Sequence, residues 1–325
     1  TVDIPDSVTS IGGSAFNQCE SLTHIAIPNS VTNMGDYLFY ECTSLASVTL
    51  STNIATIPFK AFSGCISLAG VTIPASVTII EPEAFRVCRS LTNITIPNSV
   101  THIGDRAFEA CSALASATIG NSVLSIPNYA FYGCSSLTNF TIGNGVTSIG
   151  GFALYGCSSL ASITIPTSTT NILDCAFSEC TSLTSATLPS CLNSIPPWLF
   201  RGCTSLTTVS IPSTVTSIGD RAFHHCSSLA SLTIPNGVTS IGDYAFRDCT
   251  SLTRTSIPDS VTTIGECLFT SCTNLTNAII GSGITNFSDW TFNVCEKLVA
   301  VYFRGNCPTA GSHVFGFADN VTVYY

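Results

Sequence analysis

Charged residues are scarce in this chain. Only 9% of the 325 residues are Asp, Glu, Lys or Arg, and the run from Ala110 to Leu173 contains none of these and no His. The formal net charge is −9, and Lys and Arg nowhere form a cluster. Nucleic acids and anionic membrane surfaces are bound through many Lys and Arg contacts. We therefore expect neither as a partner.

Long apolar runs are also missing. Although 45% of the residues are hydrophobic, Ser, Thr, Asn, Gly or Pro interrupts every few positions, whereas a spanning helix needs roughly 18 or more consecutive apolar residues. We expect no membrane insertion of this segment. The first residues, TVDIPDSVTSIG, enter in mid-repeat without the charged and apolar regions of a signal peptide. We expect a chain whose signal was removed, or part of a longer protein.

Catalytic sequence motifs are missing as well. No H-E-x-x-H, G-x-S-x-G or P-loop pattern occurs, and the five histidines are scattered. His225 stands beside Cys226, but a Cys–His enzyme needs both groups facing one cleft, and here we expect Cys226 inward and His225 outward. We predict no enzymatic activity, no catalytic residue and no cofactor.

What the chain has in abundance is repetition with a period of 23 residues. The pattern CSSLASLTIPNGVTSIGDYAFRD recurs thirteen times, which overrides the two-domain expectation from length and predicts one elongated solenoid. We assign residues 1–303 to about thirteen coils and residues 304–325, where the pattern breaks, to a C-terminal capping segment. The repeat is marked by a column of cysteines at 19, 42, 65, 88, 111, 134, 157, 180, 203, 226, 249, 272 and 295.

The repeat predicts three local structures in each coil. Segments such as Leu91–Ile96 alternate inward and outward and are expected to be short parallel strands, and Val238–Ile241 is a second extended piece. Segments such as Gly242–Cys249 are expected to form a single helical or 3₁₀ turn. An aspartate at the start of this turn is expected to cap it, as at Asp36, Asp105, Asp220, Asp243 and Asp289. The fold class is an α/β repeat solenoid, right-handed, with little regular helix.

Columns of Phe, Leu and Ile with this period predict the core, and the cysteine column is expected to join it. Cys behaves as a small buried hydrophobe, so we favour packing over redox or metal-binding roles. The total of 17 is odd, so at least one thiol is unpaired. The redox state of the cysteines outside the column stays open, namely Cys175, Cys191, Cys267 and Cys307.

The motif L-x-x-I-x-I-P followed by V-T-x-I-G-x-x-A-F-x-x-C resembles the BspA-like class of leucine-rich repeats, similar to those of Treponema surface proteins. The resemblance covers residues 4–303. It implies a bacterial or protozoan surface protein that binds host matrix proteins or other cells. The tail resembles the closing segment of secreted bacterial members.

A ladder of hydroxyls is predicted on the outward face of the strands. Outward positions of successive coils form rows spaced by about 4.8 Å, and such a row can dock a protein, a glycan polymer or ice. The alternative is that the row has no binding role, because half-polar, β-branched Thr is well suited to any solvent-exposed strand. The ladder residues proposed for binding are Thr95, Thr118, Thr141 and Thr164.

Two clusters are predicted on the turn-bearing face. The first is an exposed aromatic cluster in the charge-free middle, which favours a contact patch: Tyr129, Tyr132, Phe152 and Tyr155. The second is a basic–aromatic patch that suits sugars or an acidic segment, with Asp220, Asp243 and Asp248 close enough to neutralise it: Trp198, Arg201, Arg221, His224, Tyr244 and Arg247. Ordinary surface filling is the alternative for both.

Charged columns have a structural explanation. The acidic column of Asp220, Asp243, Glu266 and Asp289 could hold Ca²⁺, but capping accounts for it, and we predict no metal site. Glu83 with Arg106 and Arg86 with Glu109 are expected to be surface ion pairs between adjacent coils.

These observations favour a secreted or cell-surface recognition or adhesion module. It would bind a protein or glycan through an extended face. The alternative is a structural surface element that self-associates, because the N-terminal coil end is exposed.

Overall fold

The computed structural model describes residues 2–318 and 320–325. Thr1 and Asp319, which the predicted solenoid and cap include, lie outside the described residues. The chain forms two compact units, residues 1–160 and 161–325, and each is a stack of coils with parallel strands. The fold is a parallel-strand solenoid of about 14 turns.

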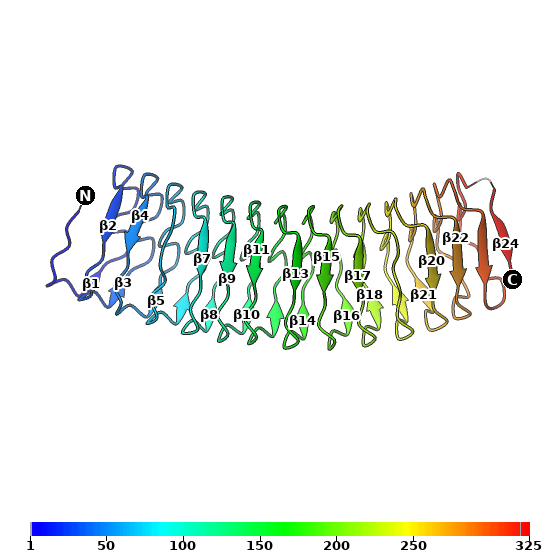
Figure 1. Ribbon diagram of the computed structural model, residues 1–325, viewed down its shortest axis with the longest axis horizontal. Coiled ribbons are helices and arrows are strands. Elements are labelled where there is room, and N and C mark those ends of the chain that lie inside the picture. Colours follow the sequence, from blue (N-terminus) through cyan, green and yellow to red (C-terminus); the bar gives the residue numbers. More distant parts are fainter. Residues whose placement is uncertain (1, 319) are drawn as a thin grey trace. The chain divides into compact units, whose positions relative to one another are not determined.

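In the first unit (Figure 1), each strand pairs with the equivalent strand 23 residues away. One row, which we call the front strands, has three residues per strand: β2 (His24–Ala26), β4 (Ser47–Thr49), β7 (Asn93–Thr95), β9 (Ser116–Thr118) and β11 (Asn139–Thr141). The second row has two residues per strand: β1 (Ser10–Ile11), β3 (Asn33–Met34), β5 (Thr56–Ile57), β6 (Ile79–Ile80), β8 (His102–Ile103), β10 (Ser125–Ile126) and β12 (Ser148–Ile149).

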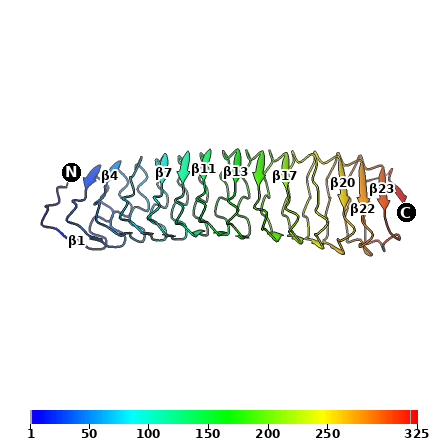
Figure 2. The same cartoon turned by 60° about the horizontal axis from the view of Figure 1, so that its bottom comes forward.

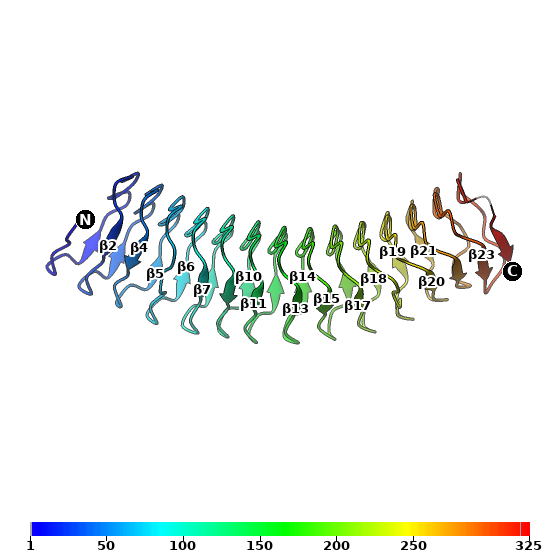
Figure 3. The same cartoon turned by 45° about the horizontal axis from the view of Figure 1, so that its top comes forward.

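The second unit has the same two rows. Its front strands are β13 (Ser162–Thr164), β15 (Ser185–Thr187), β17 (Thr208–Ser210), β20 (Arg254–Ile257), β22 (Asn277–Ile280), β23 (Ala300–Phe303) and β24 (Thr322–Tyr324). Its second row is β14 (Asn171–Ile172), β16 (Ser194–Ile195), β18 (Ser217–Ile218), β19 (Ser240–Ile241) and β21 (Thr263–Ile264). The rows can be followed in Figures 2 and 3: β7 and β11, labelled in both, belong to the front row, and β10, labelled in Figure 3, belongs to the second row.

The expected helical or 3₁₀ turn is wrong, because no helix occurs in the part of the chain that the structure describes. Each turn segment instead places two residues in the left-handed region, for example Tyr129 at φ 56° and Gly133 at φ 70°. Alternate amides then donate to the next coil: Tyr129 N–H to Gly151 O (3.0 Å) and Gly133 N–H to Tyr155 O (2.8 Å). Left-handed residues interrupt a right-handed helix. The turn is therefore held by backbone hydrogen bonds to the next coil, as a strand is held by its neighbour in a sheet.

The predicted aspartate caps are wrong for the same reason. Asp220 Oδ1 accepts a hydrogen bond from the Asp243 amide (3.0 Å), and Asp243 Oδ1 accepts one from the Glu266 amide (2.8 Å). Each carboxylate thus satisfies a backbone donor 23 residues later, in the next coil, and not a donor in its own turn. No described residue belongs to a helix that is long and apolar enough to cross a membrane.

The predicted core columns are buried. In the first unit Phe85 and Phe108 stack with ring centroids 5.4 Å apart and planes 3° apart, and Phe108 and Phe131 follow at 5.2 Å. The second unit repeats this arrangement, ending with Phe292 on Phe315 at 5.8 Å. Phe315 lies in the predicted capping segment, so that segment continues the aromatic column.

Column cysteines contribute a hydrogen bond as well as volume. The Cys134 thiol donates to Phe108 O (3.2 Å), a carbonyl of the preceding coil that also accepts the Cys111 amide (3.3 Å). The same thiol-to-carbonyl bond recurs along both units, as at Cys65 and Cys226. Burial raises the pKa of these thiols, to about 11 at Cys42 and about 12 at Cys295. The packing role is therefore supplemented by satisfaction of a buried acceptor.

One of the two predicted ion pairs is confirmed. Arg86 Nε lies 3.3 Å from Glu109 Oε1 in the next coil. Arg106 instead pairs with Glu109 in its own coil (Nε–Oε2 3.5 Å), and Glu83 is approached by Lys60 (3.5 Å). Both arginine side chains are substantially exposed, so each pair contributes under about 1 kcal/mol.

Candidate functional site

The predicted threonine ladder is in register on the front strands of the first unit. Thr95 pairs with Thr118, and Thr118 with Thr141, across β7, β9 and β11. The side chains of Thr95 and Thr141 are exposed and that of Thr118 is half-buried. Three hydroxyl-bearing side chains therefore follow one another at the spacing of parallel strands, about 4.8 Å.

A second ladder, which sequence reasoning did not identify, lies beside the threonines. Asn98 Oδ1 accepts a hydrogen bond from the Asn121 amide (2.8 Å), and Asn121 Oδ1 accepts one from the Asn144 amide (2.9 Å). The signal was present, because Asn recurs three residues after Thr95, Thr118 and Thr141. All three asparagines are exposed, and these hydrogen bonds fix the side-chain orientations of Asn98 and Asn121.

Together the two ladders line a groove of about 410 Å³. The floor of the groove is formed by the two residues between the Thr and the Asn of each coil. Gly120 and Gly143 allow the coils to approach closely there, because a Cβ on Gly143 would lie 2.4 Å from Gly120 O. We call this surface the front groove. It is lined by the segments Thr95–Asn98, Thr118–Asn121 and Thr141–Asn144, none of which carries a charged residue.

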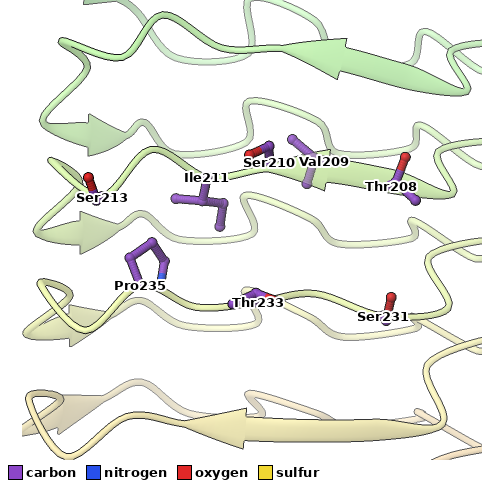
Figure 4. Close-up of a pocket in the computed structure, with 8 residues that line it drawn as sticks. All are labelled: Thr208, Val209, Ser210, Ile211, Ser213, Ser231, Thr233 and Pro235. Atoms are coloured by element: carbon purple, nitrogen blue, oxygen red, sulfur yellow. The ribbon is translucent and has the colours of Figure 1, made fainter.

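Thr164 belongs to the second unit, where it pairs with Thr187 across β13 and β15 and is exposed. The front row of that unit is interrupted after β17, because residues 231–234 form no strand. A hollow of about 540 Å³ lies at the interruption. In Figure 4, Thr208 and Ser231 lie at one end of this hollow and Ser213 and Pro235 at the other.

The aromatic cluster of the first unit is assembled as predicted, but its members are half-buried, not exposed. Tyr129 stacks on Phe152 (5.0 Å, 3°) and Tyr132 on Tyr155 (5.0 Å, 6°). The Arg106 guanidinium lies 4.7 Å from the centre of the Tyr129 ring. The ring faces of Tyr129 are therefore covered by its neighbours, which is why its exposure is low.

The basic–aromatic patch is also assembled. Arg221 lies between two rings, 4.6 Å from the centre of Trp198 and 4.4 Å from that of Tyr244. Arg201 lies over Trp198 at 5.4 Å and forms an ion pair with Glu179 (2.6 Å). Cation–π stacking and ion pairing within the chain thus engage the groups that were expected to face a ligand.

Asp248 neutralises part of this patch, as predicted. Its Oδ2 lies 3.2 Å from Arg247 Nε, 3.2 Å from His224 Nε2 and 3.5 Å from His225 Nε2. Burial, and secondly the neighbouring His225, lower the pKa of His224 to about 4. Cys226 is buried and His225 exposed, as expected. The proximity of His225 to Asp248 was missed, although the two occupy the same position of adjacent repeats.

The comparisons with known proteins support the repeat assignment. The BspA type Leucine rich repeat region (6 copies) matches residues 1–115, 110–230 and 216–323. Among curated proteins, none matches this chain.

Three solved structures show the same fold. A leucine-rich repeat protein from Bacteroides ovatus is 28% identical, with a TM-score of 0.77, over 97% of this chain and 87% of that one. A leucine rich cell surface protein from Faecalibacterium prausnitzii is 28% identical with a TM-score of 0.53, over 92% and 84%. A leucine-rich repeat protein from Eubacterium ventriosum is 27% identical with a TM-score of 0.54, over 79% and 78%.

The 23-residue coils, the matched repeat family over nearly the whole length and these structural neighbours agree. The chain belongs to the BspA-type leucine-rich repeat family.

Proposed function

We propose that this chain is an extracellular recognition module that binds a protein or a glycan through the front groove. The observation that carries the proposal is the repetition of one polar rung, Thr followed three residues later by Asn, in three successive coils of the same groove. Equivalent hydroxyl and carboxamide groups at a constant spacing suit an extended partner with repeating hydrogen-bonding groups, such as a glycan or a strand-like peptide.

The absence of charged residues from the segments that line the groove narrows the chemical class of the partner. The groove lies within coils whose front segments carry no ionisable residue. Binding there would rest on hydrogen bonds and apolar contact, so its affinity should change little with salt. We therefore favour an uncharged glycan or an uncharged peptide segment.

The turn-face clusters are less suited to sugar stacking. Sugars need an open aromatic face, whereas Tyr129 is covered by Phe152 and Arg106. Trp198 likewise has the guanidinium groups of Arg201 and Arg221 over its ring. These contacts favour an intramolecular stabilising role for both clusters.

The test is binding of the purified chain to an array of matrix proteins and glycans, with three double variants. Thr118→Lys/Thr141→Lys fills the groove with charged side chains, and Thr164→Lys/Thr187→Lys makes the same change on the front strands of the second unit. Tyr132→Ala/Tyr155→Ala opens the aromatic cluster. Loss of a partner in the first variant alone would support the proposal, whereas loss only in the third would move the site to the turn face.

A location at the cell surface or outside the cell follows from the same proposal. It is supported by the family and by the Faecalibacterium neighbour, which is described as a cell surface protein.

Self-association remains a second candidate function. It is favoured by the exposed aromatic residues Tyr302, Tyr324 and Tyr325 on and beside β23 and β24. Light scattering across a concentration series separates the two functions, because a pure recognition module should stay monomeric.

A further inference from the structure

Three side chains with metal-ligating atoms converge on the turn face of the second unit. The Nε2 atoms of His224 and His225 lie 3.2 and 3.5 Å from the same Oδ2 atom of Asp248. The three ligand atoms all lie within 4.8 Å of one another, and no other group of three or more such residues occurs in residues 2–318 and 320–325.

The repeat brings these side chains together. His225 and Asp248 occupy the same position of adjacent coils, and both adopt the left-handed conformation, at φ 61° and 60°. The His225 amide donates to Arg247 O (2.9 Å), which fixes the spacing of the two turns. His224 precedes His225 directly, so the two rings lie side by side with centroids 4.3 Å apart.

The distances match a tetrahedral zinc site. Zinc bonds of about 2.0–2.1 Å to His nitrogen and carboxylate oxygen place neighbouring ligand atoms ~3.3–3.4 Å apart. The two separations from Asp248, 3.2 and 3.5 Å, lie on either side of that value. The ligand nitrogens of the two imidazoles lie within 4.8 Å of each other, and the side chain of His225 is 54% exposed and can move.

The ligand set is of the kind that zinc takes, because it consists of two imidazole groups and one carboxylate. We propose that His224, His225 and Asp248 bind a divalent transition-metal ion of the zinc class, with the fourth position open toward solvent. This site is separate from the front groove and does not depend on the proposed function.

The positive charge of Arg247 disfavours a bound cation, so replacing Arg247 gives a control whose expected effect has the opposite sign. Its Nε atom lies 3.2 Å from the same Asp248 oxygen, so a cation must displace it. Its side chain is 40% exposed and lies 5.7 Å from the Tyr244 ring centre, where it can remain after leaving the carboxylate. Removing this positive charge should therefore tighten metal binding, the opposite of what is expected if Arg247 only stabilises the fold.

The experiment titrates the full chain with ZnCl₂ by calorimetry at neutral pH, after treatment with EDTA and alkylation of the accessible thiols. Titration with Co²⁺ then reports the ligand type, because nitrogen and oxygen ligands give visible d–d bands without thiolate charge transfer. The variants are His225→Ala, Asp248→Asn, which suits a left-handed position, Arg247→Gln, and His102→Ala as a distant control. Circular dichroism establishes that each is folded.

We expect one site in the unaltered chain and in His102→Ala. Affinity should fall at least tenfold in His225→Ala and Asp248→Asn and should rise in Arg247→Gln. The proposal is overturned if the unaltered chain shows no stoichiometric binding, if His225→Ala binds as tightly, or if the Co²⁺ spectrum shows thiolate ligation.

Discussion

Raising the pH should unfold this protein through its cysteine columns. Burial raises the pKa of eight column thiols far above that of an exposed thiol: Cys65, Cys88, Cys134, Cys203, Cys226, Cys249, Cys272 and Cys295. The folded chain therefore holds these protons more tightly than the unfolded chain does. The stabilisation is complete below the unfolded pKa of about 8.5 and is lost as the pH rises above it toward the folded pKa.

The magnitude is large because the contributions accumulate. At pH 9.5 each unfolded thiol gains about 1.4 kcal/mol from ionisation that the buried thiol cannot match, so eight thiols together cost about 11 kcal/mol. A folded domain is stable by about 5–15 kcal/mol. Other groups with alkaline pKa values contribute less, since the chain has two lysines and tyrosine ionises mainly near pH 10.

The assay follows far-UV circular dichroism and thiolate absorbance together, in reducing buffer from pH 7 to 11. We expect a cooperative loss of structure between about pH 9.5 and 10.5, with thiolate appearing in the same step. Cys249→Ala is the matched variant: it should be less stable at pH 7, yet lose about 1.4 kcal/mol less on going to pH 9.5. Thiolate forming with an ordinary midpoint near pH 8.5 while the dichroism stays unchanged would refute the reasoning.

Three further predictions concern packing and exposure. Phe131→Ala should lower the free energy of unfolding of the first unit by about 3–5 kcal/mol, measured from the urea midpoint. Phe131→Leu should lower it far less, because Leu154 already occupies this column. Equal effects of the two substitutions would contradict the stacking argument. Alkylation of the native chain at pH 8 should label the exposed Cys191 and Cys307 and leave Cys134 unlabelled by mass spectrometry, and fast labelling of Cys134 would show that the column is open. Arg221→Ala should destabilise the second unit by about 1–2 kcal/mol, through the loss of its contacts with Trp198 and Tyr244, and an unchanged melting temperature would contradict this.

The periodicity predicted the coils because inward positions are a property of the sequence alone. The Phe and Cys columns and the strands at Leu91–Ile96 and Val238–Ile241 have their counterparts in buried residues and in β7 and β19. The turn could not be predicted in the same way. A Gly–Asp–x–Ala–Phe segment is compatible with a helix locally, and only the hydrogen bonds to the next coil favour the left-handed conformation at residues such as Tyr244.

The candidate sites, like the fold, could be predicted from the sequence only in part. Thr95, Thr118 and Thr141 were predicted to align because strand register follows from the repeat. The asparagine ladder escaped notice because its purpose, accepting an amide 23 residues later, depends on contact between coils. The aromatic cluster was expected to be exposed, but Tyr129 and Phe152 bury their faces against each other, which residue type does not reveal. The role of residues 304–325 as a cap remains a prediction.

The most direct test of the account is hydrogen exchange of the chain with and without a partner found on the array. The account predicts that the partner protects residues 95–98, 118–121 and 141–144, the three rungs of the front groove, and leaves exchange at Tyr129–Tyr132 and Phe152–Tyr155 unchanged. Protection confined to the turn segments, with the three rungs exchanging as in the free chain, would contradict it.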